Sequence, residues 1–161
     1  MSTTRLKKYQ TIPFLNTATS ANPTWARIGM STIFDLVLNA QVETNDFISY
    51  EMPVDDVTYY KPELAQELQT NKGDDAFDEI YSMFQSLPTG EDVKKELLLV
   101  FAGNTGTDLA PTYFAWKCNA TLILDHFDTV AEKIYFKFSI YEKTAGSVSI
   151  TGGVPSFTPA S

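Results

Sequence analysis

Hydrophobic and polar residues alternate along several long stretches of the chain, a pattern typical of strands with one buried face. The two longest stretches cover residues 112–124 and 134–140, and a short polar turn over residues 126–132 separates them. Two such strands joined by a short turn predict a β-hairpin. Further strands are predicted at residues 28–38, 57–60, 97–102 and 148–150.

One stretch, residues 75–87, has a helical period instead. Its large apolar residues recur at the spacing i, i+3, i+4 and i+7, which defines one face of an amphipathic helix: Phe77, Ile80, Tyr81 and Phe84. Gly73 precedes the stretch and Pro88 follows it, as expected at helix ends. Residues 63–71 are ambiguous, because their composition is helical although only Leu64 and Leu68 are strongly apolar.

Four carboxylates crowd the start of this predicted helix: Asp74, Asp75, Asp78 and Glu79. A cation site and an acid/base pair are two possible interpretations. A calcium loop, however, alternates its ligands around a glycine and ends in a distant glutamate. We therefore expect Asp74 or Asp75 to cap the free N–H groups, with the other carboxylates favoured by the helix dipole.

These elements predict one mainly β domain, a β-sandwich or partial barrel of about seven strands with one flanking α-helix. Residues 1–24 lack periodicity and are predicted to be an extended N-terminal arm. Residues 25–151 would form the β domain, and residues 152–161 a Gly/Pro-rich C-terminal tail. The early basic residues are not followed by an apolar segment, so a signal peptide is not expected.

The formal net charge of −8 argues against binding to nucleic acid or to an anionic membrane. No stretch has the roughly 20 apolar residues of a membrane helix. The charge is uneven, because residues 1–27 carry Arg5, Lys7, Lys8 and Arg27 without any acid, whereas residues 46–79 hold ten acids and two lysines. The two regions are either complementary between neighbouring copies or simply a solvated acidic surface and a frayed tail.

Residues suited to catalysis are few. The single cysteine, Cys118, lies on a predicted apolar face, and the single histidine, His126, lies at the end of the predicted strand. On one extended strand they are too far apart for a nucleophile pair. Nucleophile-elbow, zinc-protease and phosphate-loop motifs are also missing from the sequence. We expect no enzyme, no cofactor and no metal site.

The order of the segments resembles the major tail tube proteins of long-tailed (siphophage-type) bacteriophages. The segments that carry the resemblance are WARIG (25–29), YYKPELAQELQTNKGDDAFDEIYSMFQSLPTGEDVKKELLLV (59–100), AWKCNATLILDHF (115–127) and GSVSITGGVPSFTPA (146–160). In that family a strand occupies the position of residues 63–71, so the resemblance implies a strand there.

The resemblance implies a structural virion protein that acts without catalysis. Such subunits form hexameric rings whose sheets join into one inner β-barrel, and the rings stack on a tape-measure protein. Tail terminator and distal tail proteins would be further partners, and DNA would pass through the tube during genome ejection without specific binding. The protein would be synthesised in the host cytoplasm and located in the virion tail, with no membrane association.

Aromatic residues beside polar ones are enriched at protein interfaces. Our candidates for subunit contacts are Trp25, Phe47, Tyr59, Tyr60, Phe77, Tyr81 and Phe84. Residues 1–24, residues 40–52 and the C-terminal tail are candidates for ring-to-ring contacts. An acidic bore would repel phosphate, and our candidates for lumen-facing acids are Asp46, Glu51, Asp55, Asp56, Glu63 and Glu67.

Two other interpretations remain open. The inner tube of a contractile tail or tailocin would share this fold, and a neighbouring sheath gene would distinguish it. A monomeric β-sandwich binding module, for example for carbohydrate, would instead show an exposed aromatic platform and no self-assembly.

Overall fold

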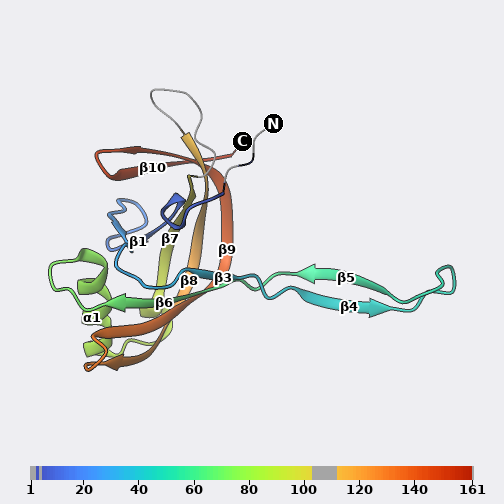
Figure 1. Cartoon of the computed structure of the whole chain (residues 1–161), viewed down its shortest axis with the longest axis horizontal. Coiled ribbons are helices and arrows are strands. Elements are labelled where there is room, and N and C mark those ends of the chain that lie inside the picture. Colours follow the sequence, from blue (N-terminus) through green and yellow to red (C-terminus); the bar gives the residue numbers. More distant parts are fainter. Residues whose placement is uncertain (1–2, 4, 103–111, 161) are drawn as a thin grey trace.

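The computed structural model describes residues 3, 5–102 and 112–160 (Figure 1). The predicted loop at 103–111 lies outside these residues. The described elements, in chain order, are η1 (Lys8–Gln10), β1 (Thr11–Asn16), β2 (Trp25–Arg27), β3 (Asp35–Val37), β4 (Gln41–Asn45), β5 (Val54–Tyr59), β6 (Glu63–Gln69), α1 (Asp75–Ser86), η2 (Gly90–Val93), β7 (Lys94–Phe101), β8 (Thr112–Asp128), β9 (Lys133–Thr151) and β10 (Val154–Pro159).

An antiparallel sheet of eight strands forms the body of the molecule, in the order β2-β1-β7-β8-β9-β6-β3, with β10 also paired to β9. β9 is long enough to pair with β6 through residues 133–139 and with β10 through residues 146–151. The strands β4 and β5 form a separate two-stranded sheet. The predicted class is confirmed: the protein is mainly β, consistent with a β-sandwich flanked by one helix. The strands outnumber the expected seven, and the described sheet is not a closed barrel.

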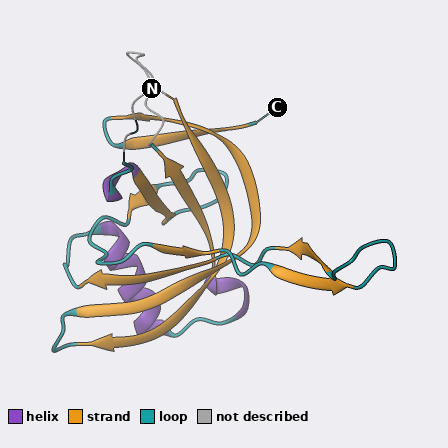
Figure 2. Cartoon of the chain, turned by 45° about the vertical axis from the view of Figure 1, so that its right-hand side comes forward, coloured by secondary structure: helices purple, strands orange, loops and turns teal. Residues whose placement is uncertain are grey.

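The helix α1 packs against one face of this sheet (Figure 2). Its residues Phe77 and Ile80 are buried among the core-facing side chains of the strands, as the helical period predicts. Met83, which the predicted stripe did not include, is also buried, whereas Tyr81 is exposed and Phe84 is half-buried. The helix ends at Leu87, which adopts a left-handed conformation with φ of 50°. A smaller core on the opposite face of the sheet gathers Phe14, Leu98, Val100, Ala115 and Val148.

The expectation of an extended arm is wrong for residues 11–16, which form the buried strand β1 between β2 and β7. Phe14 belongs to the smaller core, whereas the adjacent Leu15 belongs to the larger one. A strand that is buried on both faces shows no alternation of polar and apolar residues, so this strand has no period-2 signal.

Residues 28–38 alternate like one strand but do not form one. They contain an irregular segment, a single bridge between Ser31 and Leu68, and then the short strand β3. Met30, Phe34 and Leu38 are exposed rather than buried on a common face.

Near the C-terminus the strands are longer than predicted. β8 continues to Asp128, so that only residues 129–132 make the turn. β9 runs without interruption through residues 148–150, and most of the predicted tail forms β10, which pairs with β9. Residues 63–69 form the strand β6, which confirms the structure implied by the resemblance for most of this segment. Among the described residues, no helix is long and apolar enough to cross a membrane.

Candidate interaction surfaces

A two-stranded ribbon projects from the body of the molecule (Figures 1 and 2). We use the term ribbon for residues 41–59, which comprise β4, β5 and the tip that joins them. Both strands are exposed along most of their length, with no fully buried residue in either. A single hairpin of two strands is only marginally stable in water, because it has no core of its own. The ribbon is therefore an element that lacks a packing partner within the described chain.

The ribbon exposes apolar side chains on one face and at its tip. Val42 lies opposite Val57, and both are more than half exposed. At the tip, the rings of Phe47 and Tyr50 are 6.2 Å apart in an edge-to-face arrangement. Ile48 next to them is fully exposed. Exposed apolar side chains clustered at the tip of a projecting element are typical of a site of protein contact.

The opposite face of the ribbon carries an acidic pair, while Asp55 lies on the same face as Val42 and Val57. Glu43 and Asp56 are directly opposite each other in the register and are both exposed. Like charges at such positions destabilise a strand pair. The Asn45 side chain donates a hydrogen bond to the Asp56 carboxylate at 3.3 Å, but no ion pair involves either acid among the described residues. This face lacks a cation that would offset the repulsion.

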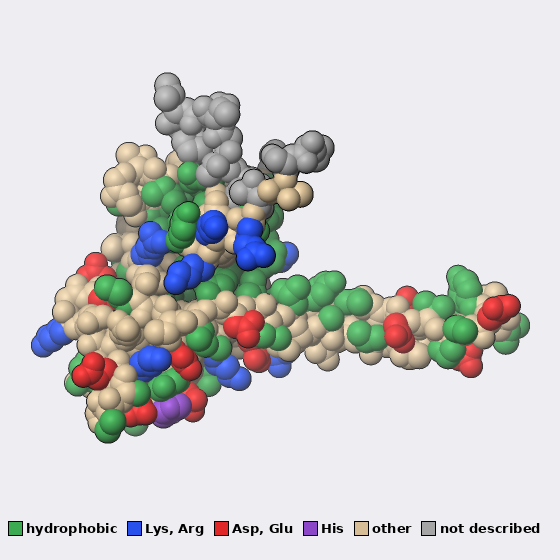
Figure 3. Space-filling model, viewed as in Figure 1, with side chains coloured by type: hydrophobic (Ala, Val, Ile, Leu, Met, Phe, Trp, Pro, Cys, Tyr) green, Lys and Arg blue, Asp and Glu red, His purple; other side chains and the backbone are tan. Residues whose placement is uncertain are grey.

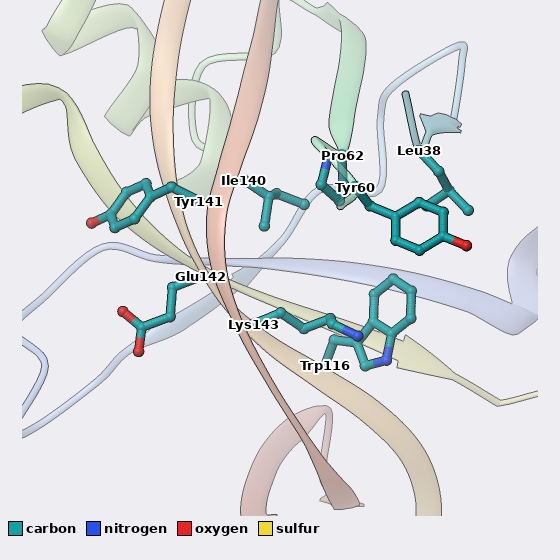
Figure 4. Close-up of a pocket in the computed structure, with 8 residues that line it drawn as sticks. All are labelled: Leu38, Tyr60, Pro62, Trp116, Ile140, Tyr141, Glu142 and Lys143. Atoms are coloured by element: carbon teal, nitrogen blue, oxygen red, sulfur yellow. The ribbon is translucent and has the colours of Figure 1, made fainter. Parts of the chain in front are cut away.

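A pocket of about 410 Å³ lies at the base of the ribbon (Figure 4). Its residues come from the segments on either side of the ribbon and from β8 and β9, and they include Tyr60, Pro62, Trp116 and Ile140. The ammonium of Lys143 lies 4.6 Å from the centroid of the Trp116 ring, within range of a cation–π interaction. The pocket offers apolar and aromatic surface rather than reactive groups.

A second hollow, of about 550 Å³, lies where η1, β1 and β2 meet residues 28–34. We call this hollow the basic groove, because Lys8 and Arg27 line it and no acid does. Its floor includes Gln66, which is 1% exposed. Neither side-chain nitrogen nor oxygen of Gln66 has a hydrogen-bond partner among the described residues.

The predicted contact residues lie in three different places. Phe47, Tyr59 and Tyr60 are exposed at the tip and base of the ribbon. Trp25 is half-buried in β2 against the smaller core. Phe77 is 3% exposed and buried in the molecule's own core, so it leaves no surface for a partner. Its prediction as a subunit-contact residue is therefore wrong.

Two further predicted contact residues also pack within the chain. Tyr81 and the half-buried Phe84 contact the ring of Phe127 on β8, with centroids 5.9 and 5.8 Å away. The helical stripe therefore packs on the sheet of its own subunit, which was one of the two arrangements expected from the sequence.

The six candidate lumen acids do not form one surface. Asp46, Glu51, Asp55 and Asp56 belong to the ribbon, where the adjacent Asp55 and Asp56 point to opposite faces because side chains alternate along a strand. The remaining two lie on β6 within ion-pair distance of lysines on β9. Glu63 is 3.7 Å from Lys137, and Glu67 is 3.8 Å from Lys133.

The carboxylates at the start of α1 cap the helix less directly than expected. Asp74 occupies the N-cap position, but its side chain makes no capping hydrogen bond. Burial raises the pKa of Asp74, the nearby Ala76 N–H at the start of the helix opposes this increase, and the neighbouring charges of Asp75 and Asp78 add to it. The Asp78 carboxylate instead accepts a hydrogen bond from the Gly73 N–H at 3.3 Å.

The residues with the most reactive chemistry are held apart. Cys118 is buried in the larger core, and burial raises the pKa of its thiol to about 12. His126 lies on the other face of β8, where its ring stacks on Tyr135 at 4.1 Å. Within the described ranges, no group of three or more His, Cys, Asp or Glu residues is placed to hold a metal ion.

Sequence reasoning identified the acidic content of residues 46–79 but missed the ribbon as an element. The alternation of Val42 with Glu43, and of Val57 with Asp56, was the available signal. The basic groove was missed because its residues come from separate segments of the sequence. Comparison with known protein families finds no matching family, and comparison with curated proteins finds no similar sequence.

Proposed function

We propose that the protein is a self-assembling structural subunit of a viral tail, the major tail tube protein of a long-tailed bacteriophage. The observation that carries this proposal is the ribbon, which exposes apolar residues on one face and at the tip and has no packing partner in its own chain. A contact with another subunit would cover this surface and stabilise the ribbon. In this proposal, subunits form hexameric rings that stack into a hollow tube for DNA.

The open sheet supports the same proposal. Among the described strands, β3 pairs only with β6, and β2 pairs only with β1. Each end of the sheet therefore has an unpaired edge, and such edges favour pairing with a neighbouring molecule. Symmetric closure of six copies would remove the exposed edges and produce the inner barrel.

In the tube, we expect the polar part of the sheet face opposite α1, outside the smaller core, to line the bore. This face carries ion pairs between neighbouring strands: Glu96–Lys117, Glu63–Lys137 and Glu67–Lys133. Paired charges weaken the electrostatic attraction or repulsion that DNA would experience at the wall. Weak wall contacts would let DNA slide, so the bore does not need the acidic lining expected from the sequence.

Negative-stain electron microscopy of the purified protein at low and at moderate salt tests the proposal. We expect hollow tubes or six-fold rings, and moderate salt should favour them by screening the repulsion between subunits of charge −8. A variant with Phe47, Ile48 and Tyr50 changed to serine should fail to assemble. The matched control is Val130→Ser, which also removes an exposed apolar side chain, in the turn between β8 and β9. A wild type that stays monomeric under all conditions, including after addition of a tape-measure protein, contradicts the proposal.

One observation favours a second candidate function. The aromatic pocket at the base of the ribbon, with Trp116 and Tyr60, is of the size and composition of a small-molecule site. A monomeric binding module would use it without self-assembly, so a monodisperse monomer that binds saccharides would support this candidate. The inner tube of a contractile tail or tailocin would assemble in the same way, and a neighbouring sheath gene would identify it.

A further inference from the structure

We propose that the ribbon of one subunit docks in the basic groove of a second copy of this chain. The inference rests on the proposed self-assembly and specifies which surfaces meet. The docked element is the acidic ribbon with its aromatic tip, and the receptor on the second copy is the hollow lined by Lys8 and Arg27.

The charges of the two surfaces are complementary. The ribbon and the adjoining Tyr60 hold five acids and neither lysine nor arginine: Glu43, Asp46, Glu51, Asp55 and Asp56. The groove and the chain leading to it hold four basic residues and no acid: Arg5, Lys7, Lys8 and Arg27. All four basic side chains belong to exposed residues, and none takes part in an ion pair in the described part of the chain. Figure 3 shows Lys and Arg side chains gathered on the body, whereas the projecting ribbon displays acidic and apolar groups.

The register of the ribbon gives a second reason for a basic partner. The Glu43 and Asp56 carboxylates face the same side from directly opposite positions. A cation from a partner would turn this repulsive pair into an attractive contact. Arg27 suits that role, because a guanidinium can bind carboxylates through several hydrogen bonds at once.

The groove also matches the ribbon in its uncharged groups. Tyr9 and Phe34, which line it, are 65% and 38% exposed and offer aromatic surface to Phe47 and Tyr50. The buried Gln66 amide has an unused donor and an unused acceptor at the floor. A polypeptide segment that enters the groove carries backbone N–H and C=O groups of the kind that this amide requires.

The aromatic pocket is the weaker receptor for the same ribbon. Its lining contains one base, Lys143, and one acid, Glu142, so it has no net charge to attract the acidic strands. The ribbon does not dock in the basic groove of its own molecule either, because it extends away from the body in both views (Figures 1 and 2). The complementary surfaces of one molecule can therefore both be satisfied by neighbouring copies.

Charge-reversal variants of the full chain test this docking. In the ribbon variant, Glu43→Lys and Asp56→Lys each add two charges and change the net charge from −8 to −4. General electrostatics predicts easier assembly for this variant, because subunits repel less. Docking in the groove predicts the opposite: at least about a tenfold increase in the protein concentration needed for assembly, which corresponds to about 1.4 kcal/mol.

The groove variant carries Lys8→Glu and Arg27→Glu, which change the net charge from −8 to −12. Its matched control, Lys72→Glu with Lys94→Glu, has the same net charge but alters exposed lysines outside the groove. We expect the groove variant to assemble at least about tenfold less readily than this control. An equal mixture of the ribbon and groove variants should recover assembly, because each reversed surface then meets a complementary one.

Sedimentation velocity and electron microscopy at about 0.1 M salt measure these outcomes. If the wild type forms tubes and both variants form them equally well, the docking is overturned and the tube function is left intact. Loss of assembly in the ribbon variant alone would place the ribbon on another surface and would also overturn the groove assignment. The wild type could instead form short oligomers and no tubes. If both variants lose these oligomers and their mixture restores them, the result supports the docking and contradicts the tube. A wild type that stays monomeric overturns both.

Discussion

Shortening the ribbon should leave the body of the protein folded and stable. Residues 43–56 would be replaced by Asn-Gly, so that the paired Val42 and Val57 are joined by a two-residue turn. Asn-Gly favours the type I′ turn that connects two antiparallel strands in this geometry. The change removes most of the ribbon and preserves its first two cross-strand pairs, Gln41–Tyr59 and Val42–Val57.

The expected change in the free energy of unfolding follows from exposure. The removed strand residues are exposed or half-buried and contribute nothing to either core. Substitutions at such positions usually alter stability by less than about 0.5 kcal/mol. Closing a shorter loop costs less chain entropy, by about 0.6 kcal/mol for each halving of its length. The shortened protein should therefore be equally stable or more stable by about 1–2 kcal/mol.

Urea denaturation followed by tryptophan fluorescence and circular dichroism measures this difference, because Trp25 and Trp116 both lie in the body. The same sample, examined by electron microscopy, should form no tubes. A loss of more than about 2 kcal/mol, comparable to the removal of a core side chain, would show that the ribbon stabilises its own subunit. That result would refute the reasoning that its packing partner is another molecule.

The remaining predictions concern the body. Ile80→Ala should lower the free energy of unfolding by about 2–5 kcal/mol, because this fully buried side chain joins α1 to the sheet, whereas the exposed Gln85→Ala should change it by less than about 0.5 kcal/mol in the same urea titration. Gly146→Ala should cost about 1–3 kcal/mol and expose the C-terminal strand to proteases, because a Cβ there would collide with the Thr158 carbonyl and the Phe157 ring; unchanged protease resistance would contradict this. The thiol pKa of Cys118, raised from 9.0 to about 12 by burial, keeps the folded thiol neutral, so stability is fully present below about pH 9 and is lost as the pH rises toward 12. Urea titrations at pH 9, 10 and 11 should show the wild type losing up to about 1.4 kcal/mol per pH unit relative to Cys118→Ala, and parallel curves would contradict the assignment.

The helix and the long hairpin could be predicted from the sequence because each has one buried face. Phe77 and Ile80 follow the helical period, and α1 buries both of them. In the strands β8 and β9, Leu122 and Phe138 face the same core, as the alternation requires. Where a single face is buried, periodicity carries the structural information.

The strands that the hydrophobic pattern alone did not predict are those for which burial follows another rule. β1 is buried on both sides, so Phe14 and Leu15 enter different cores and no alternation results. β6 has the composition of a helix, yet its pairing with β9 imposes an extended conformation, and Gln66 is buried between Leu64 and Leu68. Tertiary contacts override local preference in such cases.

The candidate surfaces were only partly accessible from the sequence, for a related reason. The sequence alone shows that basic residues predominate before residue 28 and that acidic residues predominate over residues 46–79. The convergence of Lys8 with Arg27, at one groove, requires the pairing of β1 with β2. The exposure of Phe47 also requires the fold, because an apolar residue in a short segment is more often part of a core.

Subunits that attract one another through complementary surfaces need an opposing repulsion if they are to remain separate before assembly. The net charge of −8 supplies long-range repulsion between whole molecules. The contact between the ribbon and the groove, by contrast, would place opposite charges within hydrogen-bonding distance. At physiological ionic strength the Debye length is about 8 Å, so the repulsion is largely screened while contacts at shorter range persist. The same acidic residues would thus keep free subunits apart at a distance and join them once the ribbon meets the groove.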